Sequence, residues 1–239
     1  MYSVNKLYDG VYTFDEGGVR SFLLVGTEKA LLIDTGFGQV DFEKELSLIT
    51  DLPVILVNTH SDGDHTGKNH MFFTRYLSPL ELERMKQKLP ADNGTYLTIK
   101  NGDSFELGGM TLEVIEIPGH TPGSIMLYDT ENKRLYSGDS ISEDNIFMFG
   151  DGRDIPLLIE NLKKLKEKNL EVKEVLPNHG ECPVYGLSEL IADIIQAAEN
   201  YLTGQKESDI ITLNFGTPFK VKRYISGRGK ILAEVIRSI

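Results

Sequence analysis

Residues 59–65, Thr-His-Ser-Asp-Gly-Asp-His, carry most of the information about the fold and chemistry of this chain. They place two imidazoles and two carboxylates within six residues, directly after the apolar run 54–57, Val-Ile-Leu-Val. Imidazole nitrogen and carboxylate oxygen are ligands that divalent metal ions recruit, and without a cation these four side chains would repel one another or stay unpaired. The segment therefore predicts a metal site on a loop that follows a strand. A polar turn without metal is the alternative interpretation.

The residues before this loop predict a βαβ unit. Residues 19–25 and 30–33 have the apolar character of neighbouring strands, and Gly-Thr-Glu at 26–28 is typical of a hairpin turn. Apolar residues at helical spacing within 42–49 then predict a helix before the strand at 54–57. Such crossovers give parallel strands, whose ligand sites lie beyond their carboxyl ends. His60 is predicted to lie at such an end.

Three further candidate ligands follow predicted strands later in the chain. The apolar and acidic residues that alternate over 112–117 indicate a half-buried strand, and shorter apolar segments at 134–137 and 174–176 indicate two more. Strands of one layered domain can end at a common rim, so their ligands can converge there. The candidates at these ends are His120, Asp139 and His179.

Composition limits the class of protein. The chain has 239 residues, of which 40% are hydrophobic, and no stretch resembles a low-complexity linker. We therefore expect a single domain over 1–239, with a C-terminal hairpin extension at about 205–239. A formal charge of −11 disfavours nucleic acid as a partner. The single cysteine, the absence of a signal-like start and the absence of a membrane-length apolar run predict a cytoplasmic protein that acts on a small molecule, not on a membrane.

The ligand candidates, taken together in chain order, resemble the metallo-β-lactamase superfamily. The pattern consists of His60-x-Asp62-x-Asp64-His65, then His120 in Pro-Gly-His-Thr-Pro-Gly-Ser, Asp139 in Ser-Gly-Asp-Ser and His179 in Asn-His-Gly. Asp-Thr-Gly at 34–36 is also similar to an early strand-end motif of that family. The resemblance covers about residues 10–190. It implies an α/β fold, the four-layer αβ/βα metallo-β-lactamase sandwich, with a binuclear metal site at one edge.

The resemblance also implies the role of each ligand. His60, Asp62 and His120 would hold the first metal, Asp64, His65 and His179 the second, and Asp139 would bridge the two. A hydroxide between the ions would be the nucleophile, so Asp64 and Asp139 are predicted to be catalytic as well as metal-binding. Two ions lower the pKa of water and neutralise the oxyanion that its attack creates. Two divalent ions, with zinc as the first candidate, are thus the expected cofactors.

Asp62 departs from the commoner His-x-His-x-Asp-His pattern of this superfamily. A third carboxylate lowers the total formal charge of two divalent ions and their ligands. Such a site should acidify its bound water less, and should favour iron or manganese more, than a site with a histidine at this position. In having a carboxylate at this position, the chain resembles the flavodiiron branch of the superfamily, whose members bind iron. Two alternatives therefore stay open: a non-haem iron redox enzyme or oxygenase, and a site in which Asp62 is no ligand and only the second metal binds.

Five other features have weaker interpretations. His70 matches no metal motif, and Cys182 is predicted to be a buried structural thiol. Arg75 and Tyr76 could meet a substrate carboxylate or cap a helix, and residues 141–150 could form either the wall of an apolar pocket or part of the core. The C-terminal basic residues could bind an anionic substrate tail, but a solvated strand edge protected by lysine is the preferred explanation. They are Lys220, Lys222, Arg223, Arg228 and Lys230.

The function predicted from these features is metal-dependent hydrolysis of a small ester, thioester, lactone or related metabolite. β-Lactam cleavage is disfavoured because such enzymes are usually exported. Nuclease activity is disfavoured because the acidic balance and the lack of a large inserted domain remove the usual means of holding a polymer. A metal sensor or scaffold on a degenerate site is the third class, and the other six ligands argue against it.

Overall fold

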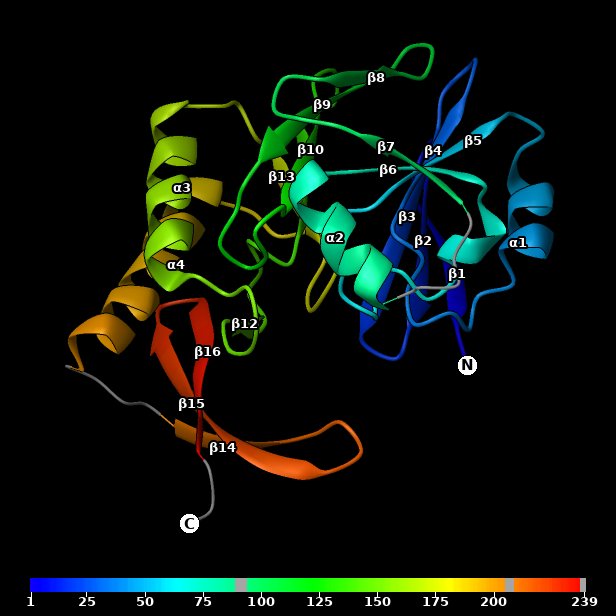
Figure 1. Cartoon of the computed structure of the whole chain (residues 1–239). Helices are drawn as coiled ribbons and strands as arrows, with labels where there is room; N and C mark the ends of the chain where they lie inside the picture. The colour runs from blue at the N-terminus through cyan, green and yellow to red at the C-terminus, as the bar shows by residue number, and fades with distance from the viewer. Residues whose placement is uncertain (89–93, 205–208, 237–239) are drawn as a thin grey trace.

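The computed structural model in Figure 1 describes residues 1–88, 94–204 and 209–236. In this part of the chain the strands form three sheets, of seven, five and four strands. The seven-stranded sheet follows chain order. Its strands are β1 (Ser3–Tyr8), β2 (Val11–Glu16), β3 (Val19–Val25), β4 (Ala30–Ile33), β5 (Val54–Val57), β6 (Thr74–Leu77) and β7 (Thr95–Thr98).

The first sheet contains the predicted βαβ unit. β3 pairs antiparallel with β4, and β4 pairs parallel with β5 after the crossover through α1 (Phe42–Ile49). The Asp41 carboxylate accepts a hydrogen bond from the Lys44 amide at the start of α1, which satisfies one of the amides that the first turn leaves unpaired. Phe42 is buried and packs edge-on against Phe14 of β2 at 5.1 Å between ring centroids. The helix therefore covers the outer face of this sheet.

The five-stranded sheet has the order β13-β11-β10-β9-β8. β11 and β13 are parallel and the other neighbours are antiparallel. Its strands are β8 (Ser104–Glu106), β9 (Thr111–Glu116), β10 (Ile125–Asp129), β11 (Arg134–Gly138) and β13 (Glu174–Pro177). α3 (Ile155–Glu167) and α4 (Leu187–Thr203) cover its outer face, and the apolar side chains Leu158, Leu162 and Leu165 of α3 are buried there.

The two large sheets face each other across one core. This core joins Phe22, Leu31 and Val57 of the first sheet to Leu127 and Leu176 of the second. Figure 1 shows α3 and α4 on one side of the stacked sheets and α1 on the other. The layers are therefore helix, sheet, sheet and helix, which confirms the predicted αβ/βα sandwich.

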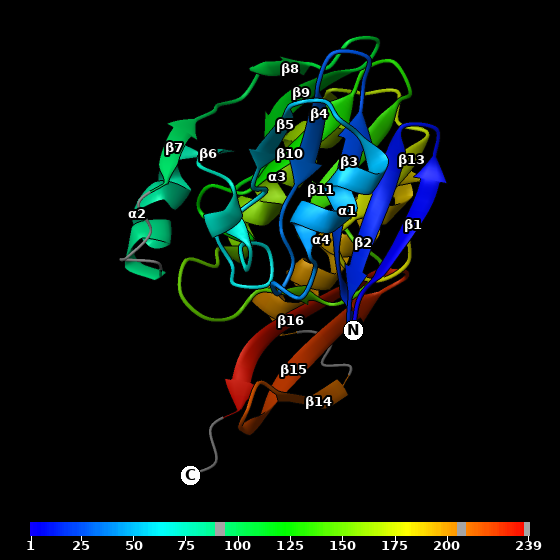
Figure 2. The ribbon, with the colours of Figure 1, turned by 90° about the vertical axis from the view of Figure 1, so that its right-hand side faces the viewer.

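The C-terminal strands form a third sheet with the order β12-β16-β15-β14. Within the 205–239 extension, β14 (Asp209–Asn214) and β15 (Pro218–Ser226) make the predicted hairpin, β16 (Gly229–Ile236) follows, and residues 205–208 and 237–239 lie outside the described residues. The short strand β12 (Ile146–Phe147) pairs with β16 and so joins this sheet to the loop after Asp139. Figure 2 shows the hairpin extending away from the stacked sheets.

Candidate metal centre

The strand ends converge as predicted, in the wall of one cavity of about 530 Å³. The loop after β5 brings Asp62 and Asp64 to this wall, and His120, Asp139 and His179 follow β9, β11 and β13 of the second sheet. The site therefore lies at an edge shared by the two facing sheets.

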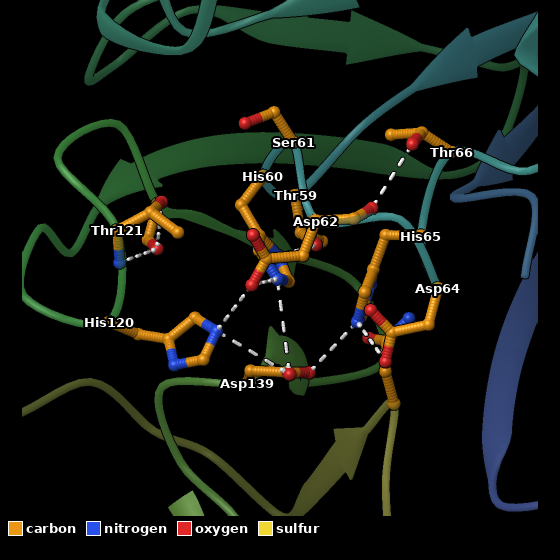
Figure 3. A network of polar contacts seen from close by, with 12 residues as sticks. Thr59, His60, Ser61, Asp62, Asp64, His65, Thr66, His120, Thr121 and Asp139 are labelled. Carbon is orange, nitrogen blue, oxygen red and sulfur yellow. Dashed lines mark hydrogen bonds and ion pairs between the residues drawn. The ribbon is translucent and has the colours of Figure 1, made fainter. Parts of the chain in front are cut away.

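Two groups of three ligand atoms lie close together. One comprises His60, His120 and Asp139, the other Asp64, His65 and His179, and within each group the atoms are within 4.8 Å of one another. Figure 3 shows Asp139 between His60 and His120 on one side and His65 on the other. Its Oδ2 lies 3.6 Å from His120 Nε2 and its Oδ1 lies 3.3 Å from His65 Nε2, so its carboxylate faces both groups.

The buried atoms of this cluster fit metal ions. Within the described residues, Nε2 of His60, of His65 and of His120 and Oδ1 of Asp139 are buried and have no hydrogen-bond partner. Polar atoms buried in this way are rare unless a ligand or water satisfies them. Two ligands of one tetrahedral ion, each about 2.0–2.2 Å from it, lie roughly 3.3–3.6 Å apart. Several separations in the cluster match this spacing, so the residues are compatible with a binuclear site.

Burial and neighbouring charges shift the pKa values of several residues in this cluster, often in opposite directions. Burial alone would lower the pKa of His179, but the Asp139 carboxylate raises it to about 10. The pKa of His65 is raised likewise, because Asp139 and Asp34 outweigh the effect of burial. Conversely, burial opposes ionisation of Asp64, but the neighbouring histidines lower its pKa to about 2. Burial lowers the pKa of His120 to about 4, so its imidazole is neutral at pH 7 and available to a metal ion.

Asp62 lies beside the first group. Its Oδ2 is 3.6 Å from Nε2 of both His60 and His120, the spacing of two ligands on one ion. The same oxygen accepts a hydrogen bond from Arg153, whose guanidinium also donates to the His120 carbonyl oxygen at 2.6 Å. A ligand role for Asp62 thus stays a prediction that the geometry permits.

Two further cations surround Asp62, and no motif in the sequence indicated them. Lys88 Nζ lies 3.0 Å and Arg84 Nη2 3.7 Å from Asp62 Oδ1, and both belong to α2 (Pro79–Lys88). With Arg153, three cations face one carboxylate, so the negative charge of Asp62 is compensated locally. The charge of Asp62 therefore does not by itself make the site less positive or favour iron.

Asp34 positions His65 and its neighbours. It follows β4 in a left-handed conformation (φ 61°) and is completely buried. Its Oδ2 contacts His65 Nδ1 at 2.8 Å and accepts hydrogen bonds from the Thr59 hydroxyl at 2.7 Å and Asn178 Nδ2 at 3.0 Å. A carboxylate on the far nitrogen of a ligand histidine fixes the ring and its tautomer. The Asp-Thr-Gly motif at 34–36 thus supports the metal loop from behind.

Glu81 connects two ligand loops. It lies at the start of α2 and is completely buried. One oxygen accepts hydrogen bonds from the amide and hydroxyl of Ser61, and the other accepts from the Gly123 amide at 2.8 Å. Ser61 adjoins His60, and Gly123 belongs to the loop that carries His120. Sequence reasoning missed Glu81 and α2 because most residues of this helix are polar and show no clear apolar stripe.

The weaker candidates lie outside the metal cluster. His70 is exposed on the short 3-10 helix Asn69–Met71, and Cys182 is partly buried, with its pKa raised to about 11 by burial. Arg75 is buried and donates to the Phe72 carbonyl oxygen and the Tyr96 hydroxyl, and Tyr76 packs edge-on against Phe105. None of these residues lines the cavity, so the suggestion that Arg75 or Tyr76 meets a substrate carboxylate is not supported.

The C-terminal basic residues do not line the cavity either. Lys222 pairs with Glu234 at 3.0 Å, Arg223 pairs with Asp209, and Arg228 pairs with Glu143 at 2.8 Å. These contacts favour the solvated-edge interpretation over a site for an anionic substrate tail.

Residues 141–150 serve both of the purposes considered for them. Ile146 and Met148 are buried in the core with α3 and α4, whereas Phe147 and Phe149 line the cavity. Successive side chains of an extended segment point to opposite faces, which explains the division.

Residues 14–179 match the sequence profile of the metallo-beta-lactamase superfamily. This chain belongs to that superfamily. It is a metallo-hydrolase of the group, as the sequence predicted. A metallo-beta-lactamase from Pontibacter korlensis has the same fold, with a TM-score of 0.68 at 23% identity over 84% of this chain and 100% of that one. No helix within the described ranges has the length and apolar character needed to cross a membrane.

Three relatives show the range of the similarity. The human acyl-coenzyme A thioesterase MBLAC2 is 26% identical over 84% of this chain and 87% of its own length. A hydroxyacylglutathione hydrolase from Bdellovibrio bacteriovorus is 28% identical over 82% of this chain and 81% of its own. A beta-lactamase-like protein 2 homolog from Caenorhabditis elegans is 27% identical over 80% of this chain. The matched region spans only 64% of the length of that relative.

Proposed function

We propose that this chain hydrolyses a small thioester, ester or lactone with two divalent metal ions held by the seven predicted ligands. The observation that carries the proposal is the set of unpartnered imidazole nitrogens and the Asp139 oxygen, buried close together, with His120 and Asp139 in the lining of one cavity. A thioester is the first candidate because two relatives are named for hydrolysing acyl groups from coenzyme A or glutathione.

The residues have distinct tasks in this proposal. His60, His120 and Asp62 would hold one ion, Asp64, His65 and His179 the other, and Asp139 would contact both. When bound, the ions would supply a water nucleophile at neutral pH and would stabilise the charge that develops on the carbonyl oxygen. Water adds to the carbonyl carbon, the carbon–sulfur or carbon–oxygen bond breaks, and the products are a carboxylate and a thiol or alcohol. One proton of the water goes to the leaving sulfur or oxygen and the other to solvent. Asp34 and Glu81 keep the ligand loops in place.

Elemental analysis of the purified protein and a substrate panel test this proposal together. We expect close to two divalent ions per chain and activity toward thioesters, esters or lactones that chelation removes and zinc restores. Asp139→Asn should lower kcat/KM at least about 100-fold, because loss of a ligand should exceed the usual effect of a ligand's support. A metal-loaded protein that hydrolyses no member of the panel would contradict the proposal.

Asp129→Asn is the matched control. Asp129 is a completely buried carboxylate, but it lies at the end of β10 opposite the site and accepts hydrogen bonds from Asn132 and the Glu131 amide. Its substitution should affect stability but leave metal content unchanged.

The redox alternative makes a different prediction for the same protein. Iron as the metal in the purified protein, together with consumption of oxygen or nitric oxide and no hydrolysis, would favour it. The cations around Asp62 remove the charge argument for this alternative, though not the likeness of its carboxylate to the flavodiiron branch. Because two relatives are named for thioester hydrolysis, we expect hydrolysis instead.

A further inference from the structure

Four phenylalanines form a closed ring of contacts next to the metal ligands. Phe147 contacts Phe149 and Phe215, and Phe219 contacts the same two residues, with ring centroids 5.6–6.1 Å apart. Phe147 and Phe149 come from β12 and the loop after it, whereas Phe215 and Phe219 come from the β14–β15 hairpin. The cluster therefore joins segments that lie some seventy residues apart in the sequence.

Most of these rings face the cavity instead of a core. Phe147, Phe149 and Phe215 line the cavity that contains Asp64, His120, Asp139 and His179. Phe215 is 69% exposed, and Phe37, from the loop after β4, lines the same cavity and is 54% exposed. Exposed aromatic rings gathered in one place mark a binding surface more often than a packing element.

The position of these rings limits what they can bind. The cavity has metal ligands in one part of its lining and phenylalanines in another, so a molecule whose reacting carbonyl lies at the metal centre would extend its substituent over the rings. Aromatic faces and edges bind apolar groups through buried area and ring contacts.

We propose that the C-terminal hairpin completes the substrate pocket, and that Phe215 selects substrates that carry an aromatic or other large apolar group beside the reacting carbonyl. This inference rests on the proposed hydrolase function. It assigns to the hairpin a role in specificity, with Phe147 and Phe149 as the opposite part of the same aromatic surface.

The test compares pairs of thioesters that share one half. The first pair is the phenylacetyl and acetyl thioesters of N-acetylcysteamine, which vary the acyl side; the second is the benzyl and methyl thioesters of acetic acid, which vary the leaving side. The full-length, zinc-loaded chain should prefer the larger member of at least one pair about 10-fold or more in kcat/KM, the scale of selectivity that an apolar pocket provides. Phe215→Ala should reduce that preference roughly 10-fold, and Phe215→Leu should keep most of it.

Phe73→Ala is the matched control for exposure. Phe73 is 70% exposed but does not line the cavity, so its substitution should leave the preference unchanged. Phe219→Ala separates packing from recognition, because Phe219 contacts Phe215 and Phe149 without lining the cavity. A fall in melting temperature in Phe215→Ala without a change in preference would mean that Phe215 only packs the hairpin, and would overturn the inference.

Binding measurements keep the test independent of turnover. Calorimetry with phenylacetate and acetate presents the same carboxylate to the zinc-loaded protein with and without an apolar group. We expect tighter binding of phenylacetate and loss of that difference in Phe215→Ala. If the wild type hydrolyses neither pair, the thioester form of the proposed function fails, yet this measurement still decides the inference. Equal binding of both carboxylates, or no wild-type preference in either pair, would contradict it.

Discussion

Asp62 is a carboxylate between a metal centre and three cations. Its Oδ2 faces His60 and His120, while Arg153, Lys88 and Arg84 contact its two oxygens. Asp62→Asn would leave those cations uncompensated beside a divalent ion and remove a proposed ligand. We expect the affinity of the first metal site to fall about 10–100-fold, so that dialysis against a chelator leaves nearly one ion per chain instead of two.

The neighbouring Asp151 provides a control for Asp62. It is fully exposed and its Oδ2 lies 3.4 Å from Arg84 Nη1, so Asp151→Asn removes a carboxylate from the same cation without touching the metal cluster. Its metal content should equal that of the wild type. Two retained ions in Asp62→Asn would show that Asp62 is neither a ligand nor needed for charge balance.

The raised pKa values of two histidines predict proton release on metal binding. His179 has a pKa of about 10 and that of His65 is also raised, so without metal both imidazoles carry a proton at pH 7. A metal ion binds only the deprotonated nitrogen, so its apparent affinity should rise with pH until the pH passes these pKa values. Calorimetry at pH 7 in buffers of different ionisation enthalpy should give on the order of two released protons. Equal heats in all buffers would contradict this assignment.

Among the elements, α2 connects two ligand loops, a role that the sequence of the helix does not indicate. Its first turn holds Glu81, which receives hydrogen bonds from the loops of His60 and His120. Glu81→Gln would put an amide donor against an N–H group in a buried place, which costs about 1–3 kcal/mol. We expect that loss in the free energy of unfolding from a urea titration of the metal-free protein, together with weaker zinc binding.

The pH dependence of the Glu81 contribution also has a definite sign. Burial opposes ionisation of Glu81, but hydrogen bonds from Ser61 and Gly123 lower its pKa. Its stabilising effect is therefore present above the pKa of the unfolded chain and is lost as the pH falls through the lower, folded value. The difference in the free energy of unfolding between the wild type and Glu81→Gln should therefore become smaller at acid pH. Glu83→Gln, on the exposed side of the same helix, should match the wild type at every pH.

The sequence predicted the elements whose pattern is local. The strands at 19–25, 30–33 and 54–57, the helix at 42–49 and the hairpin of β14 and β15 each have their own apolar period or turn residues, and all are present. α2 has no such period. Its function depends on Glu81, whose partners Ser61 and Gly123 lie twenty and forty-two residues away, so no local pattern could reveal it.

At the scale of the whole molecule, the sequence indicated the ligands but not their surroundings. Candidate ligands could be found because each follows a strand and keeps the spacing of its family. The cations around Asp62 and the phenylalanines around the cavity come from separate segments, and only the packing of the third sheet brings Phe215 to Phe147. The proposed substrate selectivity therefore depends on how the predicted hairpin packs against residues 141–150, which no local pattern in the sequence could show.

The ligands come from both sheets, so metal should stabilise the molecule as a whole. His60 and His65 follow β5 of the first sheet, whereas His120, Asp139 and His179 follow strands of the second. An ion present at about 1,000 times its dissociation constant contributes about 4 kcal/mol to the folded state, and each kcal/mol raises the melting temperature of a chain of this size by about 2–4 °C. Zinc should thus raise the melting temperature of the chelator-treated protein by roughly 8–16 °C. Asp139→Asn removes the carboxylate that faces both groups and should lose most of this rise, while Asp129→Asn should keep it. An equal rise in Asp139→Asn would mean that the metal does not link the two sheets through Asp139.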